Sequence, residues 1–217
     1  MPEESPPTTP IRPLHDVWLR PRRVFRDLAD KPIGAVDYLL GAAQGMVSWL
    51  FLSREQGAGT TTGLAEILGT ALLVGPFAGI AGLFLMTAIY SRLGRRAGGT
   101  STRNQVFHVF AYSGVPLVAS LAIWVVTALL AGETAFVKTP RADTEPFIAW
   151  LLQGQLIAHG LLIAWSYLLQ VMGFSEVEGF AAGRAFKIWV LGQVLIALAL
   201  FVLGVIVLSF GGDPNAH

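Results

Sequence analysis

The sequence has no cysteine and few charged residues. Asp, Glu, Lys and Arg make up 13% of its 217 residues, whereas soluble domains have about 25%. The absence of cysteine excludes disulfides, thiolate catalysis and cysteine-ligated zinc or iron–sulfur sites. Because 53% of the residues are hydrophobic, the composition indicates a membrane protein with one membrane domain.

Motifs of enzyme and metal sites are also lacking. The chain has no P-loop, no Gly-x-Ser-x-Gly and no His-Glu-x-x-His. Glu176 and Glu178 would point different ways on a helix, and pairing with Arg184 or Lys187 explains them better than acid–base catalysis. We therefore expect a non-enzymatic protein with no catalytic residue, no metal and no cofactor. The four histidines are dispersed without metal-ligand spacing: His15, His108, His159 and His217.

Long apolar runs are abundant. The run Ile67–Tyr90 has twenty-four residues without a charge, which as a helix exceeds the roughly 30 Å of a bilayer's hydrocarbon core. The sequence thus predicts an all-α integral membrane protein with five transmembrane helices in a membrane domain of residues 32–210, then a short tail, 211–217. Pro76 and Pro116 predict kinks. The other four spans are expected at Val36–Leu52, Val106–Leu130, Phe147–Met172 and Ile188–Phe210.

Two segments precede the first span. Residues 1–13 are proline-rich and polar, which predicts a disordered tail without the apolar core of a signal peptide. Residues 14–31 place apolar side chains every three or four positions, and Pro21 is typical of a first helical position. We expect an amphipathic interfacial helix there, although its apolar face could instead dock on the protein's own spans. Its expected lipid-headgroup contacts are Arg20, Arg22, Arg23 and Arg26.

The basic residues fall unevenly around the five predicted spans. Twelve lie before the first span, between the second and third, or between the fourth and fifth, and the other three are Arg54, Lys138 and Arg141. The positive-inside rule then predicts a cytoplasmic N-terminus and an outside C-terminus. We expect a multi-pass protein of the bacterial inner membrane.

Small residues repeat within the first two predicted spans. Glycines spaced four apart let two helix backbones approach closely, within the molecule or against a partner. The expected packing positions are Gly41, Gly45, Gly75, Gly79 and Gly82.

A few polar residues lie within the predicted spans. Gln155 and His159 are four apart and share one helix face. They predict either an intramembrane polar site or simple hydrogen bonds between helices, the role also expected of Gln44 and Gln193. No span carries a charge at mid-depth, which disfavours an ion-coupled transporter.

Two polar residues and one motif lie near the ends of the predicted spans. Asp37 is expected near water, and His108 is expected at the membrane interface. The Ser175-x-x-Glu178 pattern matches a capping box and predicts a helix that begins near Glu176 and enters the fifth span.

Three stretches resemble the bacterial branch of the Yip family, the Ypt/Rab-interacting membrane proteins. They are RPRRVFRDLADKP (Arg20–Pro32), FHVFAYSGVP (Phe107–Pro116) and WSYLLQVMGFSEVEGFAAGRAFKIWV (Trp165–Val190). The resemblance implies a five-span fold and its topology. The Asp-Leu-Tyr-Gly-Pro motif of the eukaryotic branch, which is associated with Rab GTPases, does not occur in this chain.

These patterns predict a membrane scaffold or accessory protein. Its expected partners are membrane lipids and a partner membrane protein or a second copy of the chain, with no nucleic acid. One alternative is a peripheral subunit of a larger bioenergetic or secretory membrane complex. The other is a lipid or small-molecule transporter with a path near Gln155 and His159.

Overall fold

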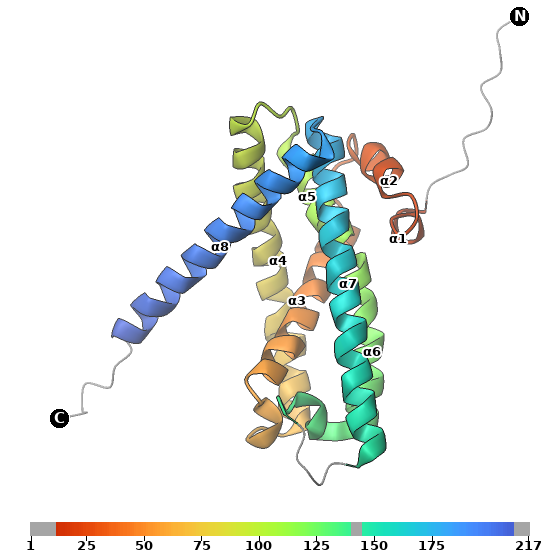
Figure 1. Ribbon diagram of the computed structural model, residues 1–217, viewed down its shortest axis with the longest axis vertical. Coiled ribbons are helices and arrows are strands. Elements are labelled where there is room, and N and C mark those ends of the chain that lie inside the picture. Colours follow the sequence, from red (N-terminus) through yellow and green to blue (C-terminus); the bar gives the residue numbers. More distant parts are fainter. Residues whose placement is uncertain (1–11, 140–144, 211–217) are drawn as a thin grey trace, which may run out of the picture.

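The computed structural model describes residues 12–139 and 145–210. The predicted tails therefore lie outside the described residues, apart from Arg12 and Pro13. Figure 1 shows the helices in order. They are α1 (Pro13–Asp16), α2 (Pro21–Leu28), α3 (Ala35–Glu55), α4 (Leu64–Arg96), α5 (Arg103–Ser113), α6 (Val115–Ala131), α7 (Pro146–Glu178) and α8 (Ala182–Phe210), with short 3₁₀ turns η1 (Ala58–Thr60) and η2 (Gly132–Phe136).

Five helical segments of the described chain are long and apolar enough to cross a membrane. The third of these segments is built from α5, α6 and η2, and each of the others is a single helix. The prediction of an all-α membrane protein with five transmembrane helices is thus confirmed. The first span is longer than expected, because α3 continues to Glu55 and includes Arg54 in its last turn.

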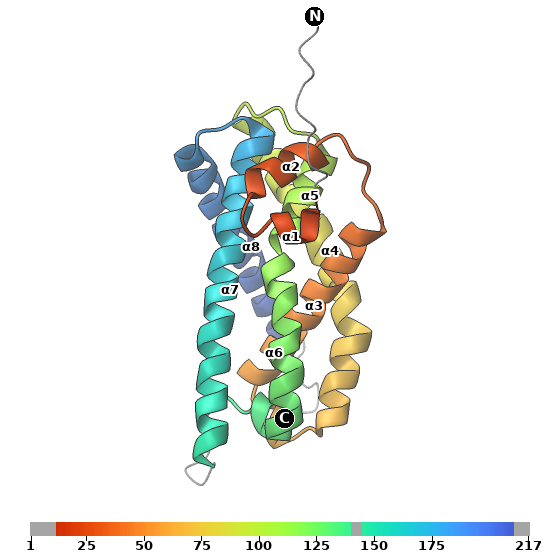
Figure 2. The ribbon, with the colours of Figure 1, turned by 90° about the vertical axis from the view of Figure 1, so that its right-hand side faces the viewer.

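The N-terminal amphipathic helix forms where the sequence places it. α2 begins at Pro21, and it lies with α1 near one end of the bundle (Figure 2). Val24, Phe25 and Leu28 are buried, and α2 packs against α7 and α5. A Cβ at Gly173 of α7 would come within 2.8 Å of the Phe25 ring. The apolar face of α2 therefore docks on the protein's own bundle, as one of the two alternatives predicted.

The third span is broken at Gly114, close to the predicted kink at Pro116. Pro116 lies in the first turn of α6, where its missing N–H leaves no carbonyl of that helix unpaired. The Gln44 amide of α3 donates a 3.0 Å hydrogen bond to the Ala111 carbonyl in α5. A Cβ at Gly114 would overlap the Gln44 side chain, so this glycine makes room for the bond. Pro76, in contrast, lies inside the continuous helix α4.

The junction between α7 and α8 corrects one prediction. No helix begins near Glu176, because α7 continues to Glu178 and ends at Gly179 in the left-handed conformation (φ 69°). Glycine adopts this conformation without steric cost and commonly ends helices. The Ser175 hydroxyl donates a 2.7 Å hydrogen bond to the Phe180 carbonyl, beyond the end of α7. The predicted capping box is therefore wrong, and α8 begins at Ala182.

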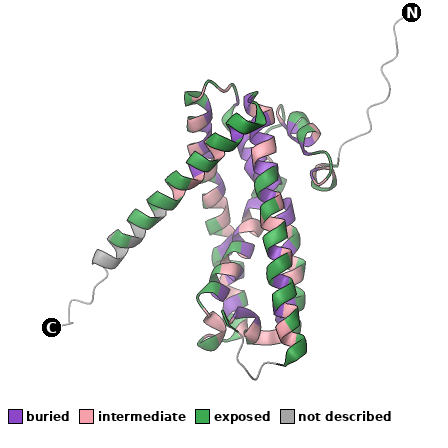
Figure 3. Ribbon diagram, in the orientation of Figure 1, coloured by how far each residue is buried: buried purple, intermediate pink, exposed green. Residues whose placement is uncertain are grey.

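Helix α8 is held less firmly than the other spans. It starts against α7 and α4, where Ala185 and Gly192 are buried. It then runs obliquely away from the bundle, and most of its described surface is exposed (Figures 1 and 3). The other four spans pack along one another and enclose two groups of buried apolar side chains, one toward each end of the bundle.

Candidate functional site

Helices α3 and α4 meet at glycines. A Cβ at Gly45 would overlap the Gly75 carbonyl oxygen, and one at Gly79 would overlap the Gly41 carbonyl oxygen. These four glycines therefore lie in a contact within the molecule. Gly82 has open space around its Cβ position.

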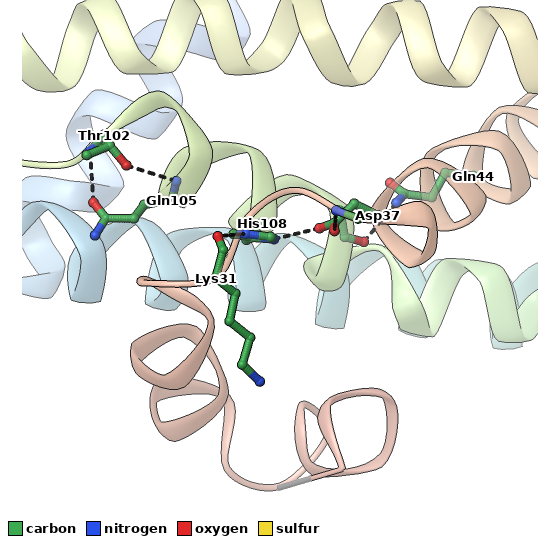
Figure 4. A network of polar contacts seen from close by, with 8 residues as sticks. Lys31, Asp37, Gln44, Thr102, Gln105 and His108 are labelled. Carbon is green, nitrogen blue, oxygen red and sulfur yellow. Dashed lines mark hydrogen bonds and ion pairs between the residues drawn. The ribbon is translucent and has the colours of Figure 1, made fainter.

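A buried ion pair joins α3 to α5 near the end of the bundle that carries α2. His108 Nδ1 lies 2.6 Å from Asp37 Oδ1, and His108 Nε2 lies 3.0 Å from the Lys31 carbonyl oxygen (Figure 4). The Gly34 N–H donates to the second Asp37 oxygen at 2.9 Å. A carbonyl oxygen only accepts, so Nε2 carries its hydrogen, and the Nδ1 contact shares one proton with the carboxylate.

This pair contradicts two expectations from the sequence. The side chains of His108 and Asp37 are only 3% and 4% exposed, so neither lies in water or at an open interface. The segment between α2 and α3 brings the Lys31 carbonyl onto His108. A contact between residues seventy-one positions apart leaves no periodic signal in the sequence.

A second buried acid lies at the same end of the bundle. Glu178 accepts hydrogen bonds from the Ser101 hydroxyl at 2.7 Å and from the Ser101 N–H at 3.2 Å. A Cβ at Gly94 or Gly99 would overlap its carboxylate, so these glycines make room for the acid. The interaction ties the end of α7 to the loop between α4 and α5.

Glu176 also has a partner that the sequence did not indicate. Two nitrogens of Arg26 donate to Glu176 Oε1, Nε at 3.0 Å and Nη2 at 2.7 Å. This contact raises the pKa of the Arg26 guanidinium above its ordinary value. Arg184 instead donates to the Ala97 carbonyl and lies over the Phe180 ring. The expected pairing of the two glutamates with Arg184 or Lys187 is therefore wrong.

The arginines of the N-terminal segment differ in their surroundings. Arg20 and Arg22 are exposed, and Arg23 is half-buried. Arg26 is exposed but already binds Glu176. Of the four expected headgroup contacts, Arg20 and Arg22 thus present the most accessible charge.

Gln155 and His159 are buried in the other half of the bundle, 3% and 2% exposed. The structure brings Arg54 to them from the end of α3, with its Nη1 3.5 Å from Gln155 Oε1. Arg54 is itself only 7% exposed. The His159 ring stacks on Phe51 at 5.7 Å between centroids, and it meets the Trp124 ring edge-on at the same separation.

Several polar atoms of this group have no partner among the described residues. They are Gln155 Nε2, Trp124 Nε1 and both ring nitrogens of His159. His159 and Ser166 line a cavity of about 270 Å³ between α3 and α7, together with Gln44, Ser48 and Gln170. Gln155 borders an apolar groove of about 440 Å³ between α6 and α7. The group therefore has unused hydrogen-bonding capacity and adjoining space.

Five apolar spans define this chain as a multi-pass helical membrane protein. Comparison with protein families then identifies its family, because the model of the Yip1 domain matches residues 16–206. The chain belongs to the Yip1 domain family, which confirms the resemblance to the Yip family. Neither the curated proteins nor the solved structures contain a match.

Sequence reasoning identified only part of the buried group. The four-residue spacing indicated that Gln155 and His159 share a face, but Arg54 was assigned to a loop and Trp124 to no site. An arginine in the last turn of a span usually extends its charge toward water. The inward direction of Arg54 depends on its neighbours from α7, so no local pattern reveals it.

Proposed function

We propose that this chain is a non-enzymatic scaffold or accessory protein of the membrane that packs against a partner membrane protein. The oblique departure of α8 from the bundle supports this proposal (Figure 1). Trp189 holds the start of the helix, since its carbonyl accepts from the Tyr90 hydroxyl at 2.7 Å and its Nε1 donates to Gln170 Oε1 at 2.8 Å. Beyond Gly192, the large apolar side chains are exposed at Val194, Leu195, Leu198, Phe201 and Val202.

The exposed part of α8 suits a second protein. In lipid, helices associate through packing and hydrogen bonds rather than through the hydrophobic effect. The described contacts of α8 with its own bundle lie in the first half of the helix, as far as Ile196. Most of its described surface is therefore exposed and available for such packing. The partner can be another membrane protein or a second copy of this chain.

Single-cysteine crosslinking tests this proposal, because the natural chain has no cysteine. We expect Leu195→Cys or Leu198→Cys to give a discrete crosslinked species in native membranes with a reagent that couples to the thiol at one end and photocrosslinks to any neighbouring chain at the other. Val125→Cys, at an exposed position of α6, is the matched control and should give none. Equal crosslinking at Val125 and on α8, or none at either, contradicts the role of α8.

We also propose that the α2 end faces the cytoplasm of a bacterial cell and contacts anionic lipid. The excess of basic residues on that side supports this orientation, and the exposed Arg20 and Arg22 suit anionic headgroups. The double variant Arg20→Gln, Arg22→Gln should co-purify with less phosphatidylglycerol than the natural protein. Arg103→Gln, an exposed arginine at the start of α5, is the control.

Two other functions remain alternatives. A peripheral subunit of a bioenergetic or secretory complex would use α8 in the same way, and identification of the crosslinked partner distinguishes it. Lipid or small-molecule transport is favoured by the buried polar group around His159 and its adjoining cavity. Flux of a substrate in proteoliposomes that His159→Ala abolishes would support transport.

A further inference from the structure

The guanidinium of Arg54 is buried, and no carboxylate of the described residues contacts it. Among residues 12–139 and 145–210, its one hydrogen bond goes to the neutral amide oxygen of Gln155, and it forms no ion pair. The carboxylate of the adjacent Glu55 attracts the guanidinium but forms no ion pair with it, because this carboxylate is 45% exposed and lies 3.8 Å from Lys138 Nζ. A buried charge ordinarily has a partner of opposite sign. Among the described residues, however, no carboxylate is in direct contact with Arg54.

The neighbouring side chains present mainly donors without partners. Within the part of the chain that the structure describes, Gln155 Nε2 and Trp124 Nε1 are donors without partners, and neither His159 nitrogen forms a hydrogen bond. A neutral imidazole supplies one further N–H donor. The group thus presents a positive charge and three kinds of N–H donor. Its acceptors are Gln155 Oε1 and the unprotonated nitrogen of His159. This arrangement has the chemistry of an oxyanion site.

We propose that an anionic phosphate group, free or in a lipid headgroup, binds between Arg54, Gln155 and His159. Arginine suits such groups because its planar donors match two oxygens at once. His159 also lines a cavity of about 270 Å³, whose lining does not include Arg54 or Gln155. The apolar groove beside Gln155, about 440 Å³, suits the acyl chain of an anionic lipid. This inference does not depend on the scaffold function.

Thermal unfolding of the full-length protein in a neutral detergent tests the site. One arm compares Tm in inorganic phosphate with Tm in chloride at equal ionic strength. The other compares Tm in phosphatidylglycerol with Tm in phosphatidylcholine. A site that is well saturated raises Tm by about 5 °C. We expect one arm to produce this shift. A response to inorganic phosphate identifies a free anion, and a response to phosphatidylglycerol alone identifies a lipid headgroup.

Gln155→Glu is the decisive variant. It preserves the shape of the side chain and places a carboxylate beside Arg54, so it supplies the missing anion from within. We expect Gln155→Glu to raise Tm without added anion and to lose the anion-dependent shift. Arg54→Gln should also lose the shift, and Arg103→Gln should keep it.

The Tm of the natural protein must rise with inorganic phosphate or with phosphatidylglycerol. Absence of a shift in both arms, or an undiminished shift in Gln155→Glu, would overturn the site. Because the crosslinking on α8 does not involve these residues, failure of either proposal leaves the other intact.

Discussion

The two ends of the bundle bury polar side chains to a similar degree but satisfy them differently. At the α2 end, Asp37, His108 and Glu178 each have hydrogen-bond partners within the protein. Toward the other end, and among the described residues, Arg54 forms no ion pair and His159 forms no hydrogen bond. Burial alone therefore does not separate a structural polar group from a binding group. The number of satisfied donors and acceptors separates them better.

The largest effect is expected at Asp37. Asp37→Ala leaves His108 and the Gly34 N–H without their acceptor inside the protein. Removing one member of a buried ion pair costs about 3–5 kcal/mol, and the loss should appear in unfolding by SDS in mixed micelles. Glu66→Ala is the control, since Glu66 also lies in the first turn of a span but is exposed. An equal loss in both variants contradicts a special role for the Asp37 pair.

The two buried histidines give the sharpest contrast. His108→Phe leaves the Asp37 carboxylate buried without its partner, so we expect a loss of about 3 kcal/mol in unfolding free energy. His159→Phe removes two nitrogens that have no partner and keeps a ring beside Phe51 and Trp124. A swap of similar volume usually changes stability by less than about 1.5 kcal/mol. An equal loss of unfolding free energy in the two variants would contradict the difference between the satisfied polar groups of one end and the unsatisfied ones of the other.

A smaller effect is expected at Glu178. Glu178→Gln places an amide against the two donors of Ser101, and a buried donor without an acceptor costs about 1–3 kcal/mol. The matched variant is Glu176→Gln, two residues earlier, whose partner Arg26 is exposed. Chemical unfolding of both variants should rank Glu178→Gln as the less stable. The reverse order contradicts the assignment of Glu178 as a structural acid.

The smallest effect is expected at Arg26. Its ion pair with Glu176 lies at the surface, with the Arg26 side chain 71% exposed. Exposed pairs contribute about 0–1 kcal/mol, so Arg26→Gln should unfold almost like the natural protein. The apolar side chains of α2 hold that helix on the bundle instead. Faster proteolysis after Arg20 in Arg26→Gln would show that the ion pair matters more than the apolar contact.

Much of the fold could be predicted from the sequence because it depends on local properties. Five long apolar runs determine five spans, and a proline at a first helical position marks the start of α2 at Pro21. The helix break near Pro116 follows from its missing N–H. The predicted start of a helix near Glu176 was wrong. Ser175 and Glu178 match a capping box, but α7 continues through both residues and ends before Gly179.

The candidate site could be predicted only in part. The spacing of Gln155 and His159 places both on one face of a helix, whatever the helix packs against. The approach of Arg54 and Trp124 requires the packing of α3 and α6 onto α7. Asp37 and His108 likewise meet only when α3 and α5 pack together.

The sequence by itself determined the class of the protein, its spans and its membership of the Yip1 domain family. Apolar length and helical periodicity are properties of neighbouring residues, so they can be read along the chain. The tertiary structure alone decided which polar groups are satisfied, that α2 docks on the bundle and that α8 departs from it. These features depend on contacts between residues far apart in sequence, whose energies no local pattern contains.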